Sequence, residues 1–123
     1  MSKPMTNSRR KGAEGEREFA HFCRDQGYGN VRRGQQFSGI EGEDVVGLPG
    51  IHVEVKRVEK LNIEDAMAQA RRDAKEGEKP IVAFRRNREK WKICMDAEDW
   101  FQLYREWEAS MDLARRDRTN GND

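Results

Sequence analysis

The segment IHVEVKR, residues 51 to 57, constrains the fold of this chain more than any other segment. Apolar and polar residues alternate along it, and successive side chains on a strand point to opposite faces of a sheet. The alternation therefore predicts a strand with one apolar face and one polar, water-facing face. The two sets are Ile51, Val53 and Val55, and His52, Glu54 and Lys56.

Hydrophobic periodicity, capping residues and turn residues predict further elements on both sides of this strand. The predicted helices run from about Ala13 to Gly27, from an N-cap at Asn62 to Gly77, and from a cap at Asp96 onward; the predicted strands cover 28–33, 43–48, 51–57, 80–84 and 91–95. The fold class is therefore α/β (α+β), a mixed central sheet of about five strands flanked by helices.

The chain has 123 residues and 35% hydrophobic content, enough for a single modest core. We expect one domain over residues 9–114, with disordered tails at 1–8 and 115–123, because both ends are polar and aperiodic. The first residues lack the apolar core of a signal peptide, and no apolar run is long enough to span a membrane, so we expect a cytoplasmic protein. Cys23 and Cys94 lack the spacing of a zinc or redox motif and are expected to be reduced.

The last predicted helix carries a row of apolar residues on one side. Trp100 and Trp107 recur there at helical spacing. The leading interpretation is a face buried in the core, and the alternative is a dimer contact. The full set is Trp100, Leu103, Tyr104, Trp107 and Met111.

The net charge of +1 hides a segregation of charge along the sequence. Residues 1–36 and 57–95 each carry a net +4, residues 37–56 carry −3, and residues 96–123 carry −4. An acidic patch thus lies between two basic segments. That distribution is typical of a protein that holds cations in one pocket and a polyanion around it.

A carboxylate pair is predicted at the centre of the acidic patch. An antiparallel hairpin centred on Pro49 sets Asp44 directly across from Glu54, about 5 Å away. Two carboxylates at that separation repel and raise each other's pKa unless a cation lies between them. Mg²⁺, or Mn²⁺ in its place, takes such oxygen ligands, whereas Glu54 and Lys56 alone would be more typical of a surface ion pair.

These residues fit the hydrolysis of a phosphodiester bond. The reaction needs a polarised phosphoryl oxygen, an activated water and neutralisation of developing charge. We expect Asp44 and Glu54 to hold the metal, and Lys56 to orient or deprotonate the water or to neutralise charge. His52 lies on the same face, but a lone histidine is more typical of a rim or hydrogen-bonded residue than of a ligand.

The pattern Asp44 … Glu54-Val55-Lys56 resembles the PD-(D/E)XK nuclease superfamily, and RKGAEGERE, residues 10–18, resembles the N-terminus of its archaeal-type Holliday junction resolvases. The likeness covers roughly residues 10–95. It departs from the family at Glu43, where the motif's name has Pro, in the longer loop 37–43 and in the added third helix. The resemblance implies a restriction-endonuclease-like fold and a Mg²⁺-dependent DNA endonuclease acting on branched DNA as a homodimer.

The resemblance also implies roles for residues outside the core motif. Glu16 on the first helix would be a third metal ligand, Ser38 would lie near the cleavage site, and Gln69 would help to hold the site. Phosphate contacts would come from basic residues that flank the acidic patch, namely Arg9, Arg10, Lys11, Arg32 and Arg33. Two other readings stay open: a less specific structure-dependent or nicking endonuclease of a mobile element, and a catalytically silent DNA-binding module.

Overall fold

The computed structural model describes the backbone of residues 7–34 and 44–120, with side chains over 11–34 and 44–119. Its element order confirms the predicted succession of helix, three strands, helix, two strands and helix. The elements are α1 (Asn7–Asp25), β1 (Arg32–Arg33), β2 (Val45–Val46), β3 (Ile51–Arg57), α2 (Ile63–Asp73), β4 (Lys79–Arg85), β5 (Lys92–Met95) and α3 (Ala97–Asn120).

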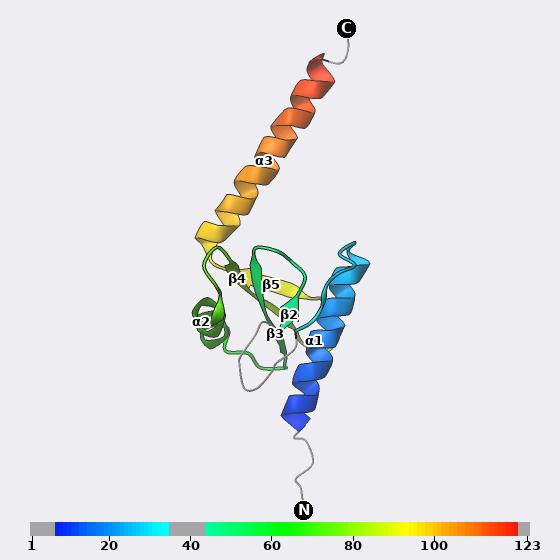
Figure 1. Cartoon of the computed structure of the whole chain (residues 1–123), viewed down its shortest axis with the longest axis vertical. Helices are drawn as coiled ribbons and strands as arrows, with labels where there is room; N and C mark the ends of the chain where they lie inside the picture. The colour runs from blue at the N-terminus through cyan, green and yellow to red at the C-terminus, as the bar shows by residue number, and fades with distance from the viewer. Residues whose placement is uncertain (1–6, 35–43, 121–123) are drawn as a thin grey trace, which may run out of the picture.

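The five strands form one mixed sheet in the order β1-β2-β3-β4-β5. β3 and β4 are parallel, whereas the other neighbours are antiparallel. A parallel pair needs a crossover between its strands, and α2 provides it. α1 and α2 flank the sheet in Figure 1. The fold is thus the predicted α+β arrangement of a mixed sheet with helices against it.

Two apolar clusters fill the space between the sheet and these helices. Against α1, Val53 and Val55 of β3 pack with Phe19, Ala20 and Cys23. Against α2, Val82 of β4 packs with a second set of buried residues. That set is Ala66, Met67 and Ala70. Cys23 and Cys94 are both free, as predicted.

The prediction that β3 has one water-facing side is wrong. His52 and Glu54 are each only 1% exposed. The alternation along β3 is real, but α2 covers the side that carries the polar groups because it is the crossover to the parallel strand β4. The polar residues of β3 therefore line a buried layer beneath a helix, and each needs a polar partner there.

The turn between β2 and β3 sets the predicted hairpin register. Ile51 N–H donates to Leu48 O at 3.1 Å, and Gly50 has a φ of +83°. Pro49 is thus the first central residue and Gly50 the second, the positions at which type II turns favour proline and require a positive φ. The observed pairing of Val45 with Val53 confirms the register.

α2 begins as predicted but ends earlier than expected. Asn62 is its N-cap, and Asn62 Oδ1 accepts from Asp65 N–H at 3.1 Å. The helix ends at Asp73 rather than at Gly77, because Ala74 is already extended, with a ψ of 139°. Gly77 instead belongs to a separate turn, closed by a 3.0 Å bond from Glu78 N–H to Lys75 O.

α3 points away from the rest of the domain in Figure 1, so the prediction that its apolar row packs in the core is wrong. Trp100, Leu103 and Trp107 are 48%, 45% and 57% exposed. Asp96 precedes the helix as predicted, but its carboxylate accepts two bonds from Arg71, of 2.5 and 3.0 Å, and α2 is thereby tied to the start of α3.

Both terminal helices also extend into the segments predicted as tails. α1 begins at Asn7, and α3 continues to Asn120. Local bonds accompany the last turns of α3, including one from Thr119 Oγ1–H to Arg115 O at 2.9 Å. Among the described residues, no helix is long and apolar enough to cross a membrane.

Candidate active site

Asp44 and Glu54 form the predicted carboxylate pair. Asp44 N–H donates to Val53 O at 3.1 Å although Val45 pairs with Val53, so Asp44 shares Val53 with Val45 and lies one position off the predicted place directly across from Glu54. Its carboxylate still interacts with that of Glu54. Burial and then the Glu54 carboxylate raise the pKa of Asp44 to about 7, against the lowering effects of the Val55 N–H and of Lys56. An oxygen-rich pair that resists holding two negative charges is a place where a cation would be stabilised.

Each carboxylate of the pair has one oxygen bonded to a nitrogen of the chain. Val55 N–H donates to Asp44 Oδ2 at 2.8 Å. His52 Nε2 lies 2.8 Å from Glu54 Oε1, and both side chains are buried. The two bonds hold one oxygen of each carboxylate and so orient both groups.

Glu16 reaches the pair from α1. A Cβ at Gly15 would lie 2.6 Å from Arg57 Cβ, so the glycine allows α1 to approach β3 closely at this point. Burial raises the pKa of Glu16, the Arg33 guanidinium lowers it, and a hydrogen bond and repulsion from Asp44 raise it. Arg33 Nε donates to Glu16 Oε2 at 2.5 Å, so an arginine beside the pair carries the balancing positive charge.

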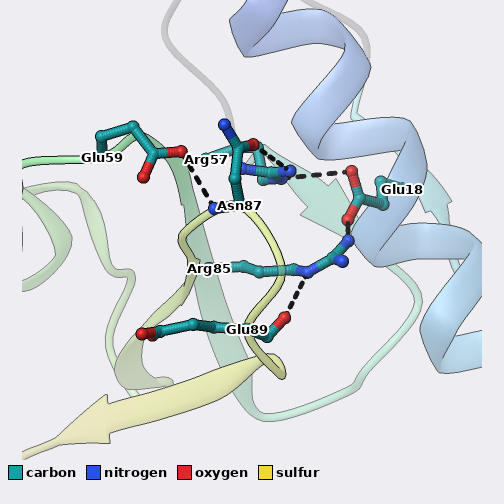
Figure 2. Close-up of polar contacts among 6 residues, drawn as sticks. All are labelled: Glu18, Arg57, Glu59, Arg85, Asn87 and Glu89. Carbon is teal, nitrogen blue, oxygen red and sulfur yellow. Dashed lines mark hydrogen bonds and ion pairs between the residues drawn. The ribbon is translucent and has the colours of Figure 1, made fainter.

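A second polar network, centred on Glu18 and Arg57, fixes α1 against the sheet (Figure 2). Glu18 accepts from Arg57 Nε at 3.4 Å and from Arg85, which lies in β4. Arg57 also donates to Asn87 Oδ1 at 2.8 Å in the turn that follows β4. Because Glu18 is two residues from Glu16, this network sets the position of the helix that carries Glu16.

Lys56 completes the group. Its Nζ donates to Gln69 Oε1 on α2 at 3.3 Å, and its charge lowers the pKa of Asp44. Lys56 and Gln69 are each partly exposed, unlike Glu54. The positive end of the group therefore lies nearer to solvent than its buried carboxylate.

The residues present fit a divalent cation. Asp44, Glu54 and Glu16 offer carboxylate oxygens, the ligands that Mg²⁺ and Mn²⁺ prefer. Burial first, and then neighbouring carboxylates, raise the pKa values of Asp44 and Glu16, and a bound cation would offset both effects. Among the described residues, the ligand atoms of His52, Glu54 and Asp73 also lie within 4.8 Å of one another.

The structure brings together five of the six predicted catalytic residues, with the predicted DNA-binding residue Arg33 bonded to one of them, and leaves others apart. Ser38 and the side chains of Arg9 and Arg10 lie outside the described residues. Lys11 and Arg32 are exposed, and Arg32 donates to Asn30 O at 3.2 Å. The five that meet are Asp44, Glu54, Glu16, Lys56 and Gln69.

Sequence reasoning missed the buried side of the site. His52 was expected at a rim or in a hydrogen bond, and the structure shows it buried and bonded to Glu54, whereas Asp73 was not considered. The signal for His52 was its place two residues from Glu54 on the same side of β3. Nothing in the sequence places Asp73 nearby, because it comes from the far end of α2.

A mixed sheet that carries this acidic pair and lysine on one central hairpin and strand has the restriction-endonuclease-like fold of the PD-(D/E)XK nucleases. A family model described as "Phage putative PDDEXK endonuclease" matches residues 7–122, and the chain belongs to that family. The chain is therefore a nuclease of the PD-(D/E)XK superfamily, with DNA as its substrate. No curated protein and no solved structure matches the chain significantly.

Proposed function

We propose that this chain is a Mg²⁺-dependent DNA endonuclease that cuts branched DNA, such as four-way junctions. The single observation that carries the metal dependence is the pair of half-buried Asp44 and buried Glu54, in which the pKa of Asp44 is raised to about 7. Such a pair is costly without a cation and well suited to one. The preference for branched DNA rests on the resemblance of residues 10–18 to archaeal-type resolvases.

The side chains divide the chemistry between them. Asp44, Glu54 and Glu16 would hold the ion. When bound, Mg²⁺ supplies polarisation of a phosphoryl oxygen and an acidified water. Lys56, held by Gln69 at 3.3 Å, orients the attacking water or neutralises the charge that develops on the phosphate.

Basic residues beside the site would position the DNA backbone. Lys11 and Arg32 are exposed on the α1 and β1 side of the sheet. Arg33 is bonded to Glu16, so its charge is shared between the site and the phosphates that approach it. Contacts of this kind fix the position of a duplex without reading its sequence.

The test is cleavage of labelled four-way junction, flap, linear duplex and single-stranded DNA, with Mg²⁺, with Mn²⁺ and with EDTA. We expect cutting of the junction with either ion and none with EDTA. Asp44→Asn and Lys56→Ala should each lose at least about a hundredfold in rate, in the range seen when one charge-stabilising group is removed.

Arg105→Ala is the matched control for Lys56→Ala, because Arg105 is an exposed cation of α3. It should cut like the wild type. Equal cutting by Lys56→Ala would refute the site. Cutting of all four substrates at similar rates would refute the junction preference and leave the nuclease assignment intact.

A less specific nicking endonuclease of a mobile element is the second candidate, and the phage description of the matching family favours it. It would use the same residues and cut one strand of a plain duplex. Conversion of supercoiled plasmid to open circles without linear product, at a rate equal to junction cutting, would select it. Binding of DNA without any cutting would instead select the catalytically silent module.

We also propose that the enzyme is a homodimer, because symmetric cutting of a junction needs two active sites. The exposed row on α3 supports a second copy of the chain as its partner: Trp100, Tyr104, Trp107, Met111 and Ala114 recur at alternating intervals of four and three, the spacing of a coiled-coil seam. Acidic residues outnumber basic ones five to one over 97–112, whereas arginines outnumber aspartates three to one over 113–120. An antiparallel pair of α3 helices would set these opposite charges side by side.

Size-exclusion chromatography coupled to light scattering measures the molar mass in solution and so tests the proposed homodimer. The wild type should elute as a dimer at micromolar concentration, and Trp107→Glu should be a monomer. Arg105→Glu also introduces an acid on α3, but away from the apolar row, and should remain dimeric. A monomeric wild type would refute the dimer without affecting the nuclease assignment.

A further inference from the structure

We propose that His52, supported by Asp73, is a positioning residue that holds the Glu54 carboxylate in its metal-binding orientation. The inference rests on the proposed function, since it assumes that Glu54 is a metal ligand. It adds two residues that lie on the side of Glu54 away from Lys56. Neither residue belongs to the Asp-Glu-Lys motif.

The contact between His52 and Glu54 is buried. The side chains of His52 and Glu54 are 1% and 2% exposed, and 2.8 Å separates Nε2 from Oε1. An ionised Glu54 can only accept, so the ring must donate its Nε2–H. Water cannot readily replace this donor at such burial, and a buried carboxylate without its hydrogen bonds is strongly destabilised.

The arrangement matches that of the other carboxylate of the pair. Asp44 Oδ2 is held by Val55 N–H at 2.8 Å, as Glu54 Oε1 is held by His52. One oxygen of each carboxylate is thus held by a nitrogen of the chain.

Lys56 and His52 flank Glu54 on the same side of β3, about 7 Å from it in opposite directions along the strand. Lys56 is partly exposed, whereas His52 is covered by α2. DNA and water therefore approach from the side of Lys56. His52 acts on the reaction only through Glu54, and for this reason we assign it a positioning role.

Asp73 lies close to the contact between His52 and Glu54. It is the last residue of α2, and its carboxylate, His52 and Glu54 present ligand atoms within 4.8 Å of one another. A carboxylate this close to the imidazole would help to hold the ring in place, as acids beside histidines do around metal sites. Asp73 is partly buried, so its effect should be smaller than that of His52.

The experiment measures Mn²⁺ binding without DNA, by electron paramagnetic resonance of free Mn²⁺ and by calorimetry, on the full chain. Removal of a group that orients a metal ligand costs about 10- to 100-fold in metal affinity. His52→Leu keeps the volume but removes the donor, and should weaken Mn²⁺ binding by that factor. His52→Gln keeps a donor and should recover most of the affinity, and Asp73→Asn should lose less than His52→Leu.

His21 provides the matched control. It is the other histidine of the chain, lies on α1 with a 67% exposed side chain and pairs with Asp25. His21→Leu should bind Mn²⁺ like the wild type. Circular dichroism and thermal unfolding of each variant separate loss of folding from loss of metal affinity, and Asp73→Asn provides the test if His52→Leu does not fold.

Three results decide between the possibilities. If the wild type binds no Mn²⁺ and cuts no DNA, the proposed function fails. If the wild type binds and cuts, but His52→Leu and Asp73→Asn fold and bind with wild-type affinity, the positioning role alone fails. If wild-type Mn²⁺ shows nitrogen hyperfine coupling that His52→Leu removes and His52→Gln does not restore, His52 is itself a ligand, and the positioning role is overturned.

Discussion

α1 and α3 carry the same kind of apolar pattern and differ in what covers it. Phe19 and Cys23 of α1 are buried against the sheet, at 4% and 5% exposure. Trp100 and Trp107 of α3 repeat at helical spacing too, yet about half of each side chain is exposed. A hydrophobic period therefore shows that a helix has a face that needs a partner, but it does not show which partner covers that face.

The ion pairs of the two regions differ too: those on α3 are local, whereas those around the site join separate elements. On α3, Arg115 pairs with Asp112 at 3.8 Å, one turn away and with both side chains mostly exposed, so the pair contributes little. Around the site, Arg33 and Glu16 lie 17 residues apart in sequence and join β1 to α1. Long-range contacts between elements fix the site, whereas local contacts shape only the helix surface.

The sharpest test of this comparison is one charge placed in each region. Val53→Asp puts an unpaired carboxylate in the core between α1 and the sheet, where Val53 is 1% exposed. It should cost more than about 4 kcal/mol and leave the chain unfolded at room temperature. Trp107→Asp should leave the circular dichroism of the domain intact and change the free energy of unfolding of the monomer by about 1 kcal/mol or less. Equal unfolding of both variants would show that α3 is part of the core.

A second test uses Asp44 in metal-free protein. Its pKa is raised to about 7 in the folded state. The folded protein therefore holds a proton that the unfolded chain releases, and stability falls as pH rises from about 4 to about 7. Asp44→Asn mimics the protonated form, so in EDTA at pH 8 it should raise the free energy of unfolding by about 2 to 4 kcal/mol. Urea denaturation at pH 8 and pH 5 measures the effect, which should shrink at pH 5; an unchanged or lower stability at pH 8 would contradict it.

The smallest expected change in stability comes from removing single hydrogen bonds at the ends of two helices. Asn62→Ala removes the N-cap bond of α2, a helix packed on the sheet, and should cost about 1 kcal/mol. Thr119→Ala removes an exposed bond near the end of α3 and should change stability by less than about 0.5 kcal/mol. Urea denaturation followed by tryptophan fluorescence distinguishes these values, and a larger loss for Thr119→Ala would show that the end of α3 is packed against the domain or a second copy.

The sequence by itself determined the elements and the core of the site. Alternation along residues 51–57, the turn at Pro49 and the cap at Asn62 are local patterns, and local patterns fix strands, turns and helix starts. The hairpin that brings Asp44 beside Glu54 followed from them, because a short hairpin allows few alternative registers.

Tertiary structure decided what covers each face. The parallel pairing of β3 with β4 brings α2 over Glu54 and His52. No sequence pattern within β3 indicates that a crossover helix follows. Asp73 reaches the site only because α2 ends there, and α3 leaves the sheet although its sequence resembles a core helix. Burial depends on elements far apart in the chain, so periodicity within one element could not predict it.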